Sequence, residues 1–186
     1  MADTRRAARR SDAERNRERI LRVAGQALAR SNDVSLHSIA KGAGVGQGTL
    51  YRHFPTREAL LLAVYRHDVG ELVDAADTLL AEHDPWRALC LWLDRLAAFG
   101  QIKNGLADAL HAATRADLVG EHYQPVIDAI GRLLRACQDA GLVRPDIDAD
   151  ELLLLVSFLW HGDRNTGWEE RSRRMLRIVL DGLAKA

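Results

Sequence analysis

A glycine-rich segment over residues 36–54 sets the narrowest limit on what this chain can fold into. It reads Leu-His-Ser-Ile-Ala-Lys-Gly-Ala-Gly-Val-Gly-Gln-Gly-Thr-Leu-Tyr-Arg-His-Phe. Two short helices around a tight turn fit this pattern, because Ser35 is placed to cap the first helix and Gly44 to adopt the positive φ of the turn. The pattern is typical of a helix-turn-helix, whose second helix can enter the major groove of DNA.

The second helix of this motif is expected over residues 47–53. Leu50 and Phe54 fall on the side that faces the first helix, and the other positions face away. The outward positions are Gln47, Gly48, Thr49, Tyr51, Arg52 and His53. Hydroxyl, amide and guanidinium groups of this kind contact phosphates and the edges of bases.

The region over residues 15–65 resembles the DNA-binding domain of TetR-family transcriptional regulators. The resemblance rests on Val34-Ser35-Leu36 through Leu60, with Gly48-Thr49-Leu50-Tyr51-Arg52-His53-Phe54 at its centre. The run Ala140-Gly-Leu-Val-Arg-Pro-Asp-Ile-Asp-Ala-Asp-Glu-Leu-Leu-Leu-Leu-Val also resembles the C-terminal domain of SbtR-like members. This chain departs from the family at Gly46, where a serine or threonine cap is common, and at His53, where a bulkier aromatic residue is common.

The resemblance implies a homodimer that binds a double-stranded DNA operator, expected to be an inverted repeat. It also implies repression of transcription, which a small-molecule effector of unknown identity relieves. Within the motif it assigns phosphate contacts to the hydroxyls of Thr49 and Tyr51. Arg57, at the start of the following helix, and Ser38 are expected to add further phosphate contacts.

Base reading is expected from Gln47 and Arg52, because the glutamine amide suits adenine and the arginine guanidinium suits guanine. Gly48 allows the helix to approach the groove closely. His53 either contacts a phosphate or packs beside Phe54, and the sequence leaves both roles open.

The distribution of charge agrees with DNA binding at one end of the chain. The net charge is zero, yet residues 1–56 hold eleven Lys or Arg against five Asp or Glu, whereas residues 57–186 hold fifteen against twenty-one. A basic first part and an acidic remainder suit a protein that places one end on phosphates.

Neither a signal peptide nor a run of about 20 apolar residues is apparent, so no membrane association is expected. Cys90 and Cys137 both fall in apolar helical stripes and are expected to be reduced, buried thiols. These features predict a cytoplasmic protein.

The predicted fold is all-α, with an N-terminal three-helix helix-turn-helix domain joined to a C-terminal helical bundle that dimerises. Residues 1–10 are expected to form a flexible basic arm, which either follows DNA or is a solvated tail. Residues 11–56 are expected to form the DNA-binding domain, whose first helix begins at a capping box of Ser11 and Glu14 and ends at Asn32-Asp33. Residues 57–186 are expected to form the ligand-binding and dimerisation domain, and one helix from Arg57 to Leu80, capped by Thr56, links the two.

Further helices are expected in the C-terminal domain. One begins at Asp84-Pro85, a short one lies near residues 106–113, and another ends at Gly141 and is expected to bend at Pro125. Asp148 and Glu151 are expected to cap the penultimate helix, and the final helix starts near Trp168.

The penultimate helix has almost no polar face over residues 152–160. A surface helix of a monomer needs a polar face, so the last two helices are expected to pair with those of a second copy. The alternative is that both helices are buried in the core of a single chain. The predicted interface residues are Leu152, Leu155, Val156, Leu159, Trp160, Met175, Val179 and Leu183.

An effector pocket is expected in the C-terminal bundle near Trp92, Phe99, His111 and Tyr123, each of which is also suited to ordinary core packing. No cofactor or catalytic activity is expected, because the sequence lacks a His-Glu-x-x-His motif, a cysteine pair and a phosphate-binding glycine loop. A metal- or redox-responsive sensor remains an alternative, with His111, His122, His161 and Asp163 as metal ligands. A helical interaction module that does not bind DNA is another.

Overall fold

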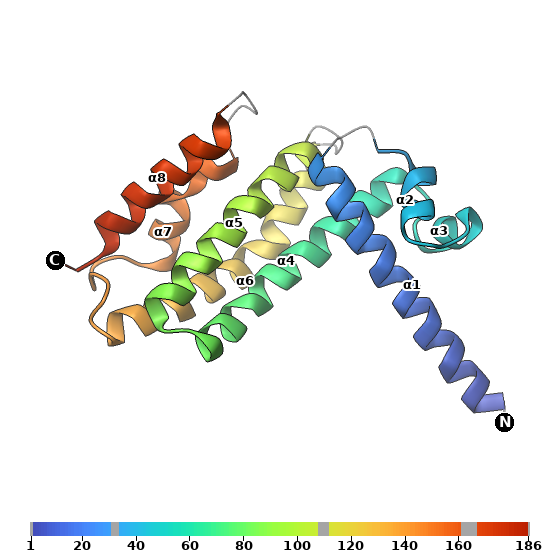
Figure 1. The fold of residues 1–186 in the computed structure, drawn as a ribbon, viewed down its shortest axis with the longest axis horizontal. Helices are drawn as coiled ribbons and strands as arrows, with labels where there is room; N and C mark the ends of the chain where they lie inside the picture. The colour runs from blue at the N-terminus through green and yellow to red at the C-terminus, as the bar shows by residue number, and fades with distance from the viewer. Residues whose placement is uncertain (1, 31–33, 108–111, 161–166, 186) are drawn as a thin grey trace.

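A computed structural model describes residues 2–30, 34–107, 112–160 and 167–185, which are helical apart from short connections and one isolated β-bridge. A small head is formed by α1 (Ala2–Arg30), α2 (Leu36–Gly42) and α3 (Gln47–His53). From the head, α4 (Arg57–Glu82) runs into a body formed by α5 (Pro85–Ala107), α6 (Ala112–Asp139), α7 (Ala149–Leu155), the 3₁₀ turn η1 (Ser157–Trp160) and α8 (Trp168–Leu183). The head lies at one end of the molecule and α7 and α8 at the other (Figure 1). The predicted all-α class is confirmed.

Polar side chains cap the helices where the sequence places them. The Thr56 hydroxyl accepts from the Ala59 amide at 3.0 Å at the start of α4, and Asp84 accepts from the Arg87 amide at 3.0 Å at the start of α5. At α7, Asp148 and Glu151 form a reciprocal capping box. Each cap satisfies an amide that the first helical turn leaves without a partner, which fixes where these helices begin.

The first helix is longer than predicted, because α1 begins at Ala2. The helix start expected at Ser11 is therefore wrong: Ser11 and Glu14 lie inside the helix, and residues 2–10 are its first turns. Alanine and arginine are strong helix formers, and neither glycine nor proline occurs between residues 2 and 24 to end the helix. The predicted end of this helix at Asn32-Asp33 lies outside the described residues.

The short helix predicted near residues 106–113 does not form a separate element in the described residues, and residues 108–111 lie outside them. Instead, α5 continues to Ala107 and α6 begins at Ala112. Pro125 lies inside α6, where it costs one backbone hydrogen bond. The turns that follow it bury Ile127, Ile130 and Leu133 against α4 and α5, and this packing outweighs the low helix propensity of proline.

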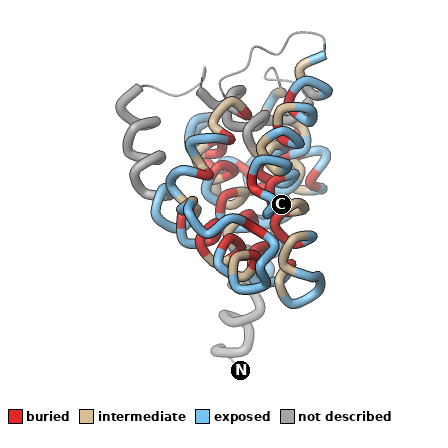
Figure 2. Tube along the Cα trace, turned by 90° about the vertical axis from the view of Figure 1, so that its left-hand side faces the viewer, coloured by how far each residue is buried: buried red, intermediate tan, exposed pale blue. Residues whose placement is uncertain are grey.

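Two hydrophobic cores share α4, and buried residues follow the inner faces of the helices (Figure 2). The first half of α4 contributes Leu60, Val64 and Val69 to the head, and the second half contributes Leu72 and Leu79 to the body. The prediction of one helix linking both parts is confirmed, and that helix ends two residues beyond the predicted Leu80. No helix among the described residues is both long and apolar enough to cross a bilayer.

An aspartate lies unpaired where α1 packs on α4. A side-chain carbon at Gly25 of α1 would lie 3.6 Å from both carboxylate oxygens of Asp68. Oδ2 of Asp68 is shielded from solvent and has no hydrogen-bond partner in the part of the chain that the structure describes. Burial raises the pKa of Asp68 from its ordinary value to about 6, with His67 lowering it and Glu71 raising it to smaller extents.

The raised pKa predicts that Asp68 destabilises the fold at neutral and higher pH. The folded state disfavours the ionised carboxylate, so ionisation of Asp68 lowers the stability of the fold. This loss of stability is absent below pH 3.8, the ordinary pKa, increases between pH 3.8 and about 6, and is complete above pH 6. Asp68→Asn should therefore increase the free energy of unfolding by about 1–2 kcal/mol at pH 8, a range reduced for solvent screening of the half-buried side chain, and by less at pH 5. Urea unfolding in EDTA at both pH values measures this.

The matched control is Asp74→Asn, which changes an exposed carboxylate on the same helix. It should leave the free energy of unfolding nearly unchanged at either pH. A loss of stability in Asp68→Asn at pH 8, or a gain that does not depend on pH, would show that burial of this charge is not costly.

Candidate nucleic-acid interface

Ser35 caps the first helix of the motif, as predicted. The Ser35 hydroxyl accepts from the Ser38 amide at 3.1 Å, and the Ser38 hydroxyl donates to the Ser35 carbonyl at 2.8 Å. These bonds close the first turn of α2 and hold Ser38 in an exposed position at its N-terminus. Backbone amides near a helix N-terminus favour anions, so the position suits a phosphate contact.

The turn between α2 and α3 depends on one glycine. Gly44 has a φ of 63°, a region that residues with a Cβ rarely occupy. Beside it, the Gly44 amide donates to the Lys41 carbonyl and the Val45 amide to the Ala40 carbonyl, which ends α2. The prediction of a positive φ at Gly44 is confirmed.

The inner side of α3 is anchored in the head. Leu50 is fully buried and Phe54 is 2% exposed, in a cluster that includes Ile39 and Ala40 of α2. The guanidinium of Arg17 on α1 lies 5.6 Å from the centre of the Phe54 ring, within the range of a cation–π interaction. These contacts fix the rotation of α3 about its own axis.

The outer side of α3 remains open to solvent. Gln47, Gly48, Tyr51 and Arg52 are exposed, and Thr49 is half-buried. These polar groups therefore share one free helical surface, which is the arrangement needed for insertion into a groove. His53 is also half-buried, and its ring centre lies 6.1 Å from that of Phe54. Of the two roles left open for His53, this distance favours packing.

Two contacts in the motif were not foreseen from the sequence. The side-chain Nε2 of Gln47 lies 2.5 Å from Nδ1 of His37 on α2, so the predicted base reader is held across the turn. Arg57 donates from Nη1 to the Val34 carbonyl, which ties the start of α4 to the segment before α2. Both partners are ten or more residues away, and no local spacing rule pairs them. Arg57 thus has a structural role in addition to the predicted phosphate contact.

Three of the four residues predicted for an effector pocket lie in the described part of the chain, and each has an ordinary structural contact there. Trp92 is fully buried in the core of the body and donates from Nε1 to the Leu72 carbonyl at 2.8 Å. Phe99 packs on Tyr65, with ring centres 5.5 Å apart. Tyr123 is 44% exposed and donates to Asp150 at 2.7 Å. His111 lies outside the described residues, as do His161 and Asp163.

A different cavity, of about 340 Å³, lies among α5, η1 and α8. Its walls include Asp94 of α5 and Trp168 and Ser172 of α8, together with Ala97, Ala98, Leu159, Arg173 and Leu176. Ser172 is 8% exposed, and its hydroxyl has no hydrogen-bond partner among the residues described. A buried hydroxyl without a partner is costly, and a polar ligand group would satisfy it.

The predicted interface residues fall into two groups. Buried in the core of the chain itself are Leu152, Val156, Leu159 and Leu183, which therefore offer almost no surface to a partner. Leu155 is 52% exposed, Met175 and Val179 are half-buried, and the side chain of Trp160 lies outside those described. The last two helices expose larger apolar groups that were not predicted: Leu154 is 73% exposed and Ile178 is 70% exposed.

Both cysteines are free thiols, and Cys137 is buried as predicted, whereas Cys90 is only half-buried. Burial raises the pKa of Cys90 and raises that of Cys137 to about 11. Thiols held in the protonated form are weak nucleophiles, which disfavours the redox-sensor alternative.

Family models of known proteins match both the helix-turn-helix and the body of this chain. The family model of bacterial regulatory proteins of the tetR family matches residues 31–64, and that of the C-terminal domain of SbtR-like transcriptional regulators matches residues 84–185. The chain belongs to the TetR family of transcriptional regulators, with an SbtR-like C-terminal domain.

Solved structures of similar proteins support this assignment over nearly the full chain. A TetR transcriptional regulator from Streptomyces coelicolor is 37% identical, with a TM-score of 0.82 over 91% of this chain and 99% of its own. A TetR regulator from Mycobacterium vanbaalenii is also 37% identical, with a TM-score of 0.75 over 95% of this chain and 99% of its own.

Similar curated sequences are helix-turn-helix regulators of Staphylococcus aureus. One is 29% identical over 182 residues, which span 95% of this chain and 98% of that protein. Another is 38% identical over 81 residues, 42% of each chain. As members of this family bind DNA operators and dimerise, the surface of α3 is the candidate DNA-reading surface.

The turn geometry predicts opposite effects of two glycine substitutions. Gly44→Ala should lower the free energy of unfolding by about 1–2 kcal/mol, because alanine is strained at positive φ. Gly48→Ala should raise it by up to about 1 kcal/mol, because Gly48 lies within α3. Among the described residues, apart from the adjoining backbone, no atom lies within 4 Å of a Cβ at either position, so the comparison of the two variants reports on backbone conformation. Denaturant unfolding measures both free energies, and equal effects of the two substitutions would contradict the positive φ assigned to Gly44.

Proposed function

We propose that this regulator is a repressor that reads an inverted-repeat operator as a homodimer, with α3 of each copy in the major groove. The observation that supports this most directly is the pairing of a buried inner side of α3 with an exposed, polar outer side. Transcriptional regulation of this kind takes place in the cytoplasm of a bacterium, where we expect the chain to act.

Contacts to phosphates position the protein and contacts to bases give it specificity. We assign phosphate contacts to Ser38, Thr49, Tyr51 and Arg57. Substitution of Arg57 would also remove its hydrogen bond to the Val34 carbonyl. A loss of DNA affinity in such a variant would therefore reflect both the missing positive charge and a displacement of α2.

Base reading is assigned to Gln47 and Arg52, whose side chains are exposed on α3. The contact between Gln47 and His37 leaves the amide with a preferred orientation before DNA arrives, which lowers the entropy lost on binding. Gly48 presents no side chain, and the open space around it allows close approach to the groove.

Arg52→Ala tests base reading. It should weaken specific binding by about 1–3 kcal/mol for each half-site and relax the preference at a single base pair there, while affinity for random DNA changes less. Competition titrations with operators substituted one base pair at a time measure this. Arg95→Ala, which removes an exposed arginine from α5, is the matched control. Equal losses on specific and random DNA would place Arg52 on the phosphate backbone instead.

The homodimer is proposed to form through the outer side of α7 and α8, the end of the molecule opposite the head (Figure 1). A groove of about 540 Å³ lies there, with walls that include Leu154, Leu155, Ile178, Val179 and Gly182. Exposed leucine and isoleucine side chains gathered on one surface mark an interaction site. Two-fold pairing at this end would leave both heads free to occupy successive half-sites.

Ile178→Asp tests the proposed interface. A carboxylate placed in a buried apolar contact has no partner, so the variant should be monomeric at concentrations where the wild type is dimeric. Analytical ultracentrifugation measures the molecular mass, and circular dichroism should show unchanged helicity. Thr78→Asp, on an exposed part of α4, should remain dimeric. A dimer that persists in Ile178→Asp would place the interface elsewhere.

We further propose that a small-molecule effector relieves repression by binding in the body and altering the position of α4. The cavity beside Ser172 is a better candidate than the predicted residues around Trp92, because it combines open volume with an unpaired buried hydroxyl. The effector must bind the state that cannot engage DNA more tightly, since equal affinity for both states would shift nothing.

A further inference from the structure

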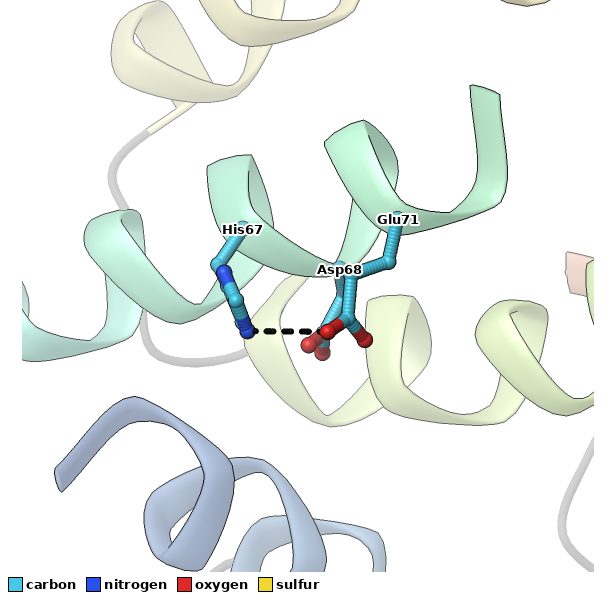
Figure 3. Close-up of side chains that lie close together, drawn as sticks. All are labelled: His67, Asp68 and Glu71. Carbon is cyan, nitrogen blue, oxygen red and sulfur yellow. Dashed lines mark ion pairs between the residues drawn. The ribbon is translucent and has the colours of Figure 1, made fainter. Parts of the chain in front are cut away.

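Three potential metal ligands converge on one side of α4, near the junction of head and body. His67, Asp68 and Glu71 each offer one donor atom, and these atoms all lie within 4.8 Å of one another. Their polar ends point toward the same space (Figure 3). The spacing explains this convergence, because residues three and four apart share a face of a helix and Glu71 therefore reaches both of the others.

The distances suit a metal ion at the centre of the three groups. The imidazole Nε2 of His67 lies 3.3 Å from Oε1 of Glu71. Nitrogen and oxygen ligands lie about 2.0–2.2 Å from zinc, so two ligands of a tetrahedral ion are about 3.3–3.6 Å apart. The pair already has this separation, and the donor atom of Asp68 lies within 4.8 Å of both of the others.

An ion pair between His67 and Glu71 would account for those two side chains but not for Asp68. Oδ2 of Asp68 is shielded from solvent and has no hydrogen-bond partner among the described residues. A half-buried carboxylate with one shielded oxygen is stabilised when it takes up a proton or acquires a cation. A divalent ion coordinated here would supply the missing partner, and two carboxylates would balance its charge.

We propose that His67, Asp68 and Glu71 form a binding site for a divalent transition-metal ion, with Zn²⁺ as the best match. One imidazole nitrogen and two carboxylate oxygens form a donor set of borderline softness, which suits zinc better than magnesium or calcium. Glu71 is 71% exposed, so the site opens to solvent and water would complete the coordination. An open site of this kind exchanges its ion readily.

The location gives the ion a physical consequence. All three ligands belong to α4, and Asp68 lies directly against Gly25 of α1. Coordination would remove the cost of an unpaired charge beneath α1 and so stabilise the packing of α1 on α4. This inference goes beyond the proposed function, because it depends neither on the operator nor on the effector.

The test uses the full chain without a histidine tag. Metal is first removed with EDTA, and the EDTA is then removed before the titration. Isothermal titration with Zn²⁺ should show binding of one ion per chain, and Co²⁺ should give the visible absorption of a coordinated ion. Replacing a residue that only supports a metal ligand weakens metal binding by about 10–100-fold. Replacing a ligand itself should weaken it at least as much, so Asp68→Asn and Glu71→Gln should each weaken Zn²⁺ binding at least tenfold. Asp74→Asn and His83→Gln, exposed residues on and just after the same helix, are the matched controls and should bind as the wild type does.

Thermal unfolding provides a second readout. An excess of Zn²⁺ of about 100 times the Kd should raise the Tm of the wild type by about 5–10 °C and leave that of Asp68→Asn unchanged. Asp68→Asn is expected to be more stable than the wild type without metal, so loss of binding cannot be attributed to misfolding. Absence of zinc binding, or binding that survives both ligand substitutions, would overturn the proposal and leave His67 and Glu71 as an ion pair.

Discussion

Burial of Leu50 and Phe54 is the constraint on which the rest of the DNA-reading surface depends. These two side chains hold the inner side of α3 against α1 and α2, and the ring of Phe54 also receives the guanidinium of Arg17. Because they fix the rotation of α3, Gln47, Gly48, Tyr51 and Arg52 are left exposed on its outer side. The glycine at position 44 completes the arrangement by allowing the chain to turn between the helices within a few residues.

The second organising element is α4, which belongs to both cores. A helix with buried residues in the head and in the body transmits a displacement from one to the other more readily than a flexible linker does. The same helix carries Asp68 and its neighbours at the junction, and its start is tied to the segment before α2 through Arg57. A change in the body therefore has a continuous physical route to the orientation of α3.

The parts of the structure that the sequence predicts are those set by local chemistry. Caps at Ser35, Thr56 and Asp148 mark the starts of helices, and glycine at positions 44 and 141 marks turns with positive φ. The family resemblance likewise predicts the helix-turn-helix and the type of C-terminal domain. What escapes local reasoning is the three-dimensional environment: the bond between Gln47 and His37, the unpaired Asp68 and the cavity beside Ser172 all depend on distant packing. The apolar run from residue 152 was also ambiguous, because its buried and exposed leucines can be told apart only once α7 is packed.

The central claim is that two copies of α3 read DNA in the major groove. Selection of bound sequences from random duplexes, with the purified chain at modest ionic strength, tests it most directly. Two-fold pairing predicts an inverted repeat whose half-sites are one helical turn apart or a multiple of it, about 10–10.5 base pairs per turn. Recovery of unrelated sequences, with no preference over the starting pool, would contradict the account.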